Sequence, residues 1–277
     1  MSAGLKWKRQ AGSDAFIQTP VAYPRLILNP APSVVIVMGV DRVRLAGALS
    51  AILTSPPEAA ALPARLCTAC AAALPVDGVG VSLMTREPGG RALLGASDAI
   101  GQRVEQLQFD LGEGPCVSAF RDAQPVLVPD LQADEARTRW PMFVREAAST
   151  GAAALFAFPL QVGTVGIGVL DCHRRQAGPL AEITETLAVA DAVTMALLNV
   201  QAHVSEGGED ANDLFDVSWR THAVVHQASG ALGAQLDIST AEALARLRAH
   251  AFSHSRPLHA VATDIMADRL DLSRDDG

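Results

Sequence analysis

Apolar residues recur at every third or fourth position through the last part of the chain, which is the spacing of amphipathic helices. The spacing predicts three short helices that close one small core, an all-α domain at 221–272 followed by a tail at 273–277. The three predicted apolar stripes are Val225, Ala228, Leu232 and Leu236; Leu244, Leu247 and Ala251; and Leu258, Val261, Ala262 and Ile265.

Two helix-start signals support these helices. Ser239 is placed to cap the second helix, and Glu242, three residues further on, is placed to reach back to the Ser239 amide in a capping box. Pro257 suits the first turn of the third helix, where a missing amide hydrogen costs nothing.

The middle of the chain alternates between strand and helix patterns. Apolar runs with turn residues between them predict strands, the last two joined as a hairpin around Gly163 and Thr164. The predicted strands are 79–85, 91–96, 125–129, 153–162 and 165–173, and the predicted helices are 61–74, 98–107, 115–121, 142–149 and 180–204. This order predicts an α+β domain at 38–204, an antiparallel sheet with flanking helices.

Two segments differ from this pattern. Residues 1–37 hold prolines at 20, 24, 30 and 32, so we expect a disordered extension, or a mis-assigned start with Met38 as the true first residue. Residues 205–220 contain Gly207-Gly208 among acidic residues, a composition that favours a flexible linker.

Composition narrows the class of protein. A chain of 277 residues with 49% apolar content can bury the cores of two domains. The formal net charge of −8 argues against a general polyanion binder. Four cysteines and no export signal indicate a reducing cytoplasm, and the longest apolar run of the N-terminal segment is too short to span a membrane.

The C-terminal segment resembles a known family. Its motif residues are Gln227-Ala228-Ser229-Gly230-Ala231-Leu232, Ile238-Ser239, Glu242-Ala243, Leu247-Arg248, Ser255-Arg256-Pro257-Leu258 and Val261-Ala262. This set resembles an ANTAR domain, a bacterial RNA-binding module of transcription antiterminators. The resemblance implies a three-helix domain whose partner is an RNA hairpin with single-stranded loop bases.

Five residues are the candidate RNA contacts. Arginine grips phosphate bidentately and stacks on unpaired bases, which favours Arg246, Arg248 and Arg256. Gln227 and Ser229 occupy the resembling motif on the first helix. We also expect the five histidines of this segment to form a partly exposed polar face that gains charge below about pH 6.5.

The charge of the segment leaves a second function open. From residue 222 to 277 there are five arginines, no lysine and seven acidic residues, so the module is net acidic. Nucleic-acid modules concentrate basic residues because phosphate neutralisation supplies most of their affinity. The alternative is a degenerate ANTAR-like module that dimerises or binds proteins without binding RNA.

The middle of the chain resembles a second family. Its motif residues are Gly112-Glu113-Gly114-Pro115-Cys116, Pro125 to Asp130, Arg139-Trp140-Pro141 with Phe143, Phe158-Pro159-Leu160, and Gly166 to Leu170. They resemble a GAF domain of the actinobacterial kind. GAF domains are small-molecule, haem, nucleotide or redox sensors, often dimeric through their flanking helices. The two resemblances together imply a sensor upstream of an RNA-binding output.

Chemistry within the predicted sensor domain is sparse. Cys116 follows Pro115 at a predicted helix start, where the thiol is either activated by the helix N-terminus or buried and inert. Glu113, Trp140 and Phe143 are the other pocket candidates, although such aromatic residues also serve as core.

The lack of histidine in the first part of the chain limits the chemistry that we expect. No histidine precedes His173, so we expect no haem, metal, cofactor or catalytic residue. A weaker alternative is a thiol-based small-molecule reductase that uses Cys116 with Cys67 or Cys70.

The helix predicted at 180–204 has the apolar spacing of a partner-seeking helix, or of a helix that simply packs on the sheet. Its apolar positions are Ile183, Leu187, Ala190, Val193, Leu197 and Val204. We expect a homodimer through 180–204 and the ANTAR-like helices. The leading hypothesis is a cytoplasmic, non-enzymatic regulator in which an unknown small-molecule effector acts on the GAF-like domain and controls RNA binding.

Overall fold

The structure is a computed structural model that describes residues 62–85, 90–205 and 209–272. The expectations for the extension at 1–37, for a start at Met38 and for the tail at 273–277 lie outside these described residues. No helix in the described ranges is both long enough and apolar enough to cross a membrane.

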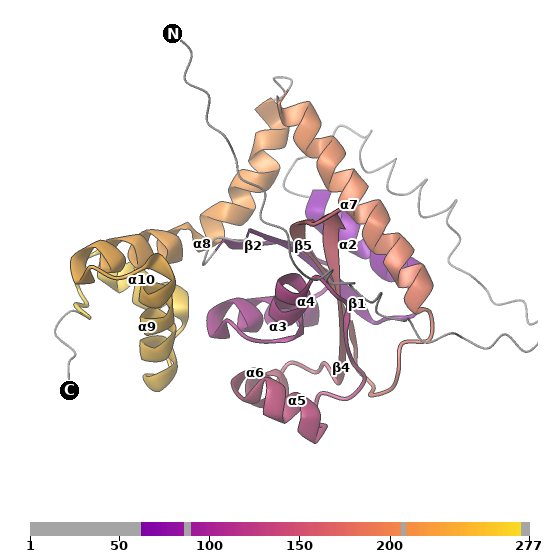
Figure 1. Cartoon of the computed structure of the whole chain (residues 1–277), viewed down its shortest axis with the longest axis horizontal. Helices are drawn as coiled ribbons and strands as arrows, with labels where there is room; N and C mark the ends of the chain where they lie inside the picture. Colours follow the sequence, from indigo (N-terminus) through magenta and orange to yellow (C-terminus); the bar gives the residue numbers. More distant parts are fainter. Residues whose placement is uncertain (1–61, 86–89, 206–208, 273–277) are drawn as a thin grey trace, which may run out of the picture. The chain divides into compact units, whose positions relative to one another are not determined.

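A five-stranded antiparallel sheet forms the centre of the first domain, in the order β2-β1-β5-β4-β3 (Figure 1). The strands are β1 Gly78–Met84, β2 Arg91–Ala96, β3 Val126–Val128, β4 Ala154–Val162 and β5 Val165–Arg174. All five were predicted, and the β4–β5 hairpin pairs Val162 with Val165 across the expected turn. The antiparallel α+β fold is therefore confirmed.

One face of the sheet is covered by α2 (Leu62–Ala73) and α7 (Ile183–Ser205) (Figure 1). Alternate residues of β4 point into this layer, where Phe156 and Phe158 are fully buried. Leu197 of α7 belongs to the same core, so at this position the helix packs on the sheet and does not face a partner subunit. Among the α7 residues whose burial is described, the large apolar side chains that remain exposed are Ile183, Leu187 and Met195.

The opposite face is covered by four helices (Figure 1). They are α3 Ala99–Leu111, α4 Pro115–Asp122, α5 Asp134–Arg139 and α6 Pro141–Ala147. α3 begins where Asp98 accepts a hydrogen bond from the Gly101 amide, and it ends at Gly112 in the left-handed conformation. The sequence did not predict α5, because six residues are too few to show a helical period.

The C-terminal helices are α8 Glu209–Leu236, α9 Thr240–Ser253 and α10 Leu258–Met266. Their predicted stripes form one core, with Leu232, Leu247 and Leu258 among its buried members. The three-helix fold is confirmed, although its first helix is much longer than predicted.

The expectation of a flexible linker at 205–220 is wrong for residues 209–220, which belong to α8. Glu209 and Asp210 are the first two residues of this helix.

Half of the predicted capping box forms. The Ser239 hydroxyl accepts a hydrogen bond from the Glu242 amide at 3.1 Å. The Glu242 carboxylate pairs with Arg246 at 3.2 Å and does not reach back to Ser239. Pro257 stands one position earlier than expected, as the N-cap of α10.

We predict that Gly168→Ala lowers the free energy of unfolding by about 2 kcal/mol or more. The added methyl group overpacks the core, and overpacking of this kind typically costs that much free energy. A Cβ atom there would lie 2.2 Å from the Ser82 carbonyl oxygen on the neighbouring central strand. Gly230→Ala is the matched control, since its Cβ atom meets open space on α8. It should be neutral or slightly stabilising. Equal urea midpoints for the two variants would contradict the close strand packing.

Candidate functional site

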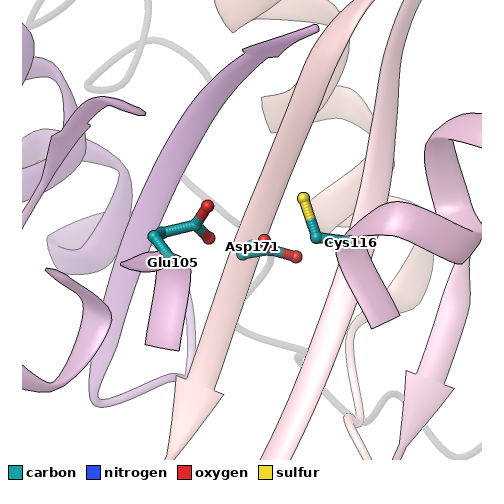
Figure 2. Close-up of side chains that lie close together, drawn as sticks. All are labelled: Glu105, Cys116 and Asp171. Carbon is teal, nitrogen blue, oxygen red and sulfur yellow. The ribbon is translucent and has the colours of Figure 1, made fainter. Parts of the chain in front are cut away.

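Polar side chains from four elements meet between the sheet and helices α3 and α4. They are Arg91 of β2, Glu105 of α3, Cys116 of α4 and Asp171 of β5, and all four are buried. Figure 2 shows Glu105 and Cys116 on either side of Asp171. One ligand atom from each of these three residues lies within 4.8 Å of the others. We call these four residues the buried cluster.

Hydrogen bonds connect the buried cluster. The Arg91 guanidinium donates to Glu105 Oε2 at 2.7 Å and to Cys116 Sγ at 3.3 Å, and the Ser82 hydroxyl also donates to Glu105. Gln108, one turn after Glu105 on α3, donates to Asp171 Oδ2 at 3.2 Å and accepts from the Cys116 amide at 2.8 Å. The cluster thereby ties α3 and α4 to the sheet.

The environment of the buried cluster shifts the pKa values of its two carboxyl groups in opposite directions. Burial and the negative charge of Glu105 raise the pKa of Asp171 well above its usual range. Burial alone would raise the pKa of Glu105, but the hydrogen bond with Asp171 and the charge of Arg91 outweigh it and lower that pKa. The cluster therefore favours the ionised form of Glu105, opposite Arg91, and the protonated form of Asp171 beside it.

This charge balance decides whether the buried cluster suits a metal ion. Burial raises the pKa of the Cys116 thiol well above its usual value, so the thiol is also neutral. A divalent cation bound to Glu105, Cys116 and Asp171 would have to remove the proton from the Cys116 thiol. It would also have to displace the Arg91 guanidinium from Glu105 and Cys116. The donor set does not fit a resident cation, and the ion pair already balances its charge.

The sensor candidates from the sequence lie around this cluster as parts of the core. The Glu113 carboxylate accepts a hydrogen bond from the Phe143 amide at 2.7 Å, in the first turn of α6. Trp140 Nε1 donates to Ser118 Oγ at 3.0 Å, and the side chains of Trp140 and Phe143 are buried. Trp140 and Phe143 therefore pack in the core and do not wall an open pocket.

The thiols do not form a redox pair. Cys67 and Cys70 lie on α2, in the core layer between α2, α7 and the sheet. Cys116 lies on the opposite face of the sheet. All three are buried, and burial raises the pKa of Cys70 to about 12. Of the two alternatives for Cys116, the structure therefore supports a buried, inert thiol. The reductase alternative needed an exposed Cys116 near Cys67 or Cys70, and this arrangement does not support it.

Three residues of the buried cluster were missed by the sequence reasoning: Arg91, Glu105 and Asp171. The available signal was a charged residue inside an apolar strand, as in Val169-Leu170-Asp171-Cys172. A charge at such a position requires a buried partner. The sequence alone does not say which partner.

The predicted RNA contacts fall into different environments. Gln227 and Arg246 are exposed, and Arg256 is half-buried. Ser229 is buried and donates to the Val225 carbonyl at 2.7 Å, so the prediction that it contacts RNA is wrong. Its position on the apolar side of α8, one residue after Ala228, explains the burial.

Each of the three predicted arginines already has a partner. Arg246 pairs with Glu242 at 3.2 Å, and Arg256 forms a hydrogen-bonded ion pair with Asp264. Arg248 Nη2 donates to the Phe109 carbonyl of α3 at 2.8 Å. Burial and the positive charge of Arg91 lower the pKa of Arg248 to about 10, which leaves it protonated at neutral pH.

The expectation of an exposed histidine face is wrong for His222. This ring is buried, and its centroid lies 3.8 Å from that of Phe109. Burial and the charge of Arg91 lower the pKa of His222 to about 4, so it is neutral at physiological pH. His250 and His254 stack on each other at 4.0 Å on α9.

Family models match both halves of the chain. A GAF domain model matches residues 60–197, and an ANTAR domain model matches residues 218–266. These ranges contain the antiparallel sheet with its helices and the three-helix core. The chain is a protein that carries a GAF domain followed by an ANTAR domain, and thus a regulator with a sensor domain and an output domain.

No curated protein matches the chain. Similar solved structures include the GAF domains of a phosphoenolpyruvate-protein phosphotransferase from Acinetobacter and from Coxiella burnetii. The first has 14% identity and a TM-score of 0.44 over 61% of this chain and 96% of that chain. The second has 15% identity and a TM-score of 0.44 over 60% of this chain and 99% of that chain.

A free methionine-R-sulfoxide reductase from Neisseria meningitidis, in complex with its substrate, is also similar. It has 19% identity and a TM-score of 0.39 over 56% of this chain and 86% of that chain. At such identities and TM-scores these structures indicate no ligand or activity for this protein.

We predict that Glu105→Gln lowers the free energy of unfolding by about 3 kcal/mol at pH 7, because it leaves the buried Arg91 charge without its partner. Asp171→Asn should cost less than about 1 kcal/mol, because an amide replaces a protonated acid and keeps the hydrogen bond with Gln108. Urea unfolding measures both variants. A loss for Asp171→Asn as large as that for Glu105→Gln would mean that both carboxyl groups are ionised.

Proposed function

We propose that this protein is a signal-responsive regulator of transcription antitermination, in which the GAF domain controls binding of an RNA hairpin by the ANTAR domain. The observation that carries the proposal is the ANTAR match at 218–266 over a completely formed three-helix core. A preserved core presents its surface residues at fixed positions, which RNA recognition needs.

The RNA surface that we propose consists of Gln227 on α8, Arg246 on α9, Arg256 before α10, and Arg248 when it is released from Phe109. Phosphate groups must compete with Glu242 and Asp264 for two of these arginines. The affinity should therefore be modest, with a salt dependence that corresponds to about two to four phosphate contacts in each protomer.

For the sensor, we propose an unidentified small-molecule effector and no chemical reaction. The buried cluster holds α3 and α4 on the sheet through a few hydrogen bonds. A ligand that reaches this layer would change the position of these helices. The four free cysteines are consistent with action in a reducing compartment such as the cytoplasm.

We propose a homodimer through α7 and the ANTAR helices. Ile183, Leu187 and Met195 are large apolar side chains that remain exposed along α7, which is a common property of helices that pack against a second subunit. The partner that we propose is a second copy of the same helix.

The second candidate function is protein interaction without RNA binding. The observation that favours it is the pairing of Arg246 and Arg256 with acidic neighbours in a module that is net acidic. Measurement of RNA binding separates the two functions.

We predict that the full-length protein retains end-labelled total bacterial RNA on a filter, with binding that weakens as salt increases. Arg256→Ala should weaken binding by about 1 kcal/mol, because it removes a phosphate or base contact. Arg121→Ala, which removes an exposed arginine from α4 of the sensor domain, is the matched control and should bind as wild type. Binding should be measured at about pH 6 and about pH 7.5, on either side of the histidine titration range. If salt-sensitive binding is absent at both pH values, the protein-interaction function replaces RNA binding as the conclusion.

We predict that Leu187→Glu gives a folded monomer in light scattering at micromolar concentration, because it places a charge on the exposed face of α7. Leu197→Glu should instead lower the unfolding temperature, because Leu197 lies in the core of the sensor domain. A monomeric wild-type protein, or a dimer that survives Leu187→Glu, would argue against dimerisation through this face.

A further inference from the structure

Phe109 belongs to sensor helix α3, yet its side chain lies in the core of the output domain. It is 2% exposed and shares a cluster with Val225, Leu232 and Leu247, whose other buried members all come from α8, α9 and α10. A buried aromatic residue contributes a large apolar area to such a contact. The described structure is thus a docked state, in which α3 completes the output core.

Two histidines of α8 surround the Phe109 ring. The His222 ring lies 3.8 Å away at a tilt of 42°, and the His226 ring lies 6.2 Å away in an edge-on geometry. Neither ring nitrogen of His222 has a hydrogen-bond partner, so this side chain contributes to the contact as an apolar, neutral ring.

Arg248 of α9 holds the same end of α3 from the other side. Its Nη2 donates to the Phe109 carbonyl at 2.8 Å, and its guanidinium carbon lies 5.9 Å from the centre of the Phe109 ring. The last carbonyl groups of a helix lack backbone partners and carry partial negative charge. Gly112, left-handed at φ 69, leaves room for the guanidinium, since a Cβ atom there would lie 2.5 Å from Arg248 Nη1.

A carbonyl group at a helix end and a phosphate group make the same demand on arginine, because both accept its N–H donors. Arg248 cannot satisfy both acceptors while its guanidinium is covered by α3. We propose that the C-terminal end of α3 and RNA compete for Arg248, so that docking of Phe109 restrains RNA binding. This inference rests on the proposed RNA-binding function and identifies the contact that regulates it.

The position of Phe109 depends on the sensor core. Glu105 and Gln108 on the same helix hold Arg91, Asp171 and the Cys116 amide. A change in the buried cluster that shifts α3 would move Phe109 and the Phe109 carbonyl together. Release of Arg248 is the expected consequence for the output domain.

Phe109→Ala in the full-length protein tests the competition with two readouts. The first is modification of Arg248 by phenylglyoxal, measured by peptide mass spectrometry, with the exposed Arg246 as internal reference. The second is filter retention of end-labelled total bacterial RNA. We expect Arg248 to be protected in wild type and reactive in the variant, and RNA binding to tighten by about fivefold or more.

Three further variants control the test. Phe120→Ala truncates a partly buried phenylalanine that packs in the sensor core alone, and it should match wild type in both readouts. Gly112→Ala should act like Phe109→Ala without emptying a core, because the new methyl group displaces the Arg248 guanidinium. Arg248→Ala combined with Phe109→Ala should lose the gain in RNA binding.

The outcomes separate the competition from the proposed function. Exposure of Arg248 with tighter RNA binding in the Phe109 and Gly112 variants supports the competition. Exposure with unchanged RNA binding overturns it and leaves the RNA-binding function standing. Equal reactivity of Arg248 in wild type and both variants overturns the docking itself. Absence of RNA binding in every variant overturns both the competition and the proposed function, whatever the reactivity of Arg248.

Discussion

The ion pair between Arg91 and Glu105 is the interaction on which the described structure depends most. Its atoms lie 2.7 Å apart in a buried layer, and either charge alone would be strongly unfavourable there. The pair therefore holds β2 and α3 in one relative position. Its charge also affects a neighbouring group, because burial and the negative charge of Glu105 together raise the pKa of Asp171. The result is a compact, charge-balanced centre that needs no ion.

Helix α3 extends the influence of that pair to the output domain. One side of the helix carries Glu105 and Gln108, which bind the sheet, and its C-terminal end carries Phe109 and the Phe109 carbonyl, which bind α8 and α9. A single rigid helix with contacts at both places is a direct physical connection between sensor and output. Coupling of this kind requires two arrangements of α3 with a small difference in free energy.

The output domain combines a completely formed core with a net acidic composition. Its apolar stripes are fully formed, whereas Arg246 and Arg256 are engaged by Glu242 and Asp264. Partly exposed ion pairs contribute little to stability, so phosphate groups can replace these carboxylates at small cost. Under the proposed function, such a surface would bind RNA weakly, and dimerisation would strengthen binding by bringing two copies of it together.

The sequence by itself determined the elements whose signals are local. Two apolar runs joined at a Gly163-Thr164 turn predicted the β4–β5 hairpin, the three- and four-residue spacing predicted the output core, and Ser239 predicted the start of α9. Tertiary structure decided what depends on burial and on distant partners. Antiparallel pairing of β1 with both β2 and β5 brings Arg91 and Asp171 toward Glu105, although many residues separate them in the chain. Burial placed Ser229, His222 and Leu197 inside cores, because spacing shows which face a residue occupies but not what covers that face.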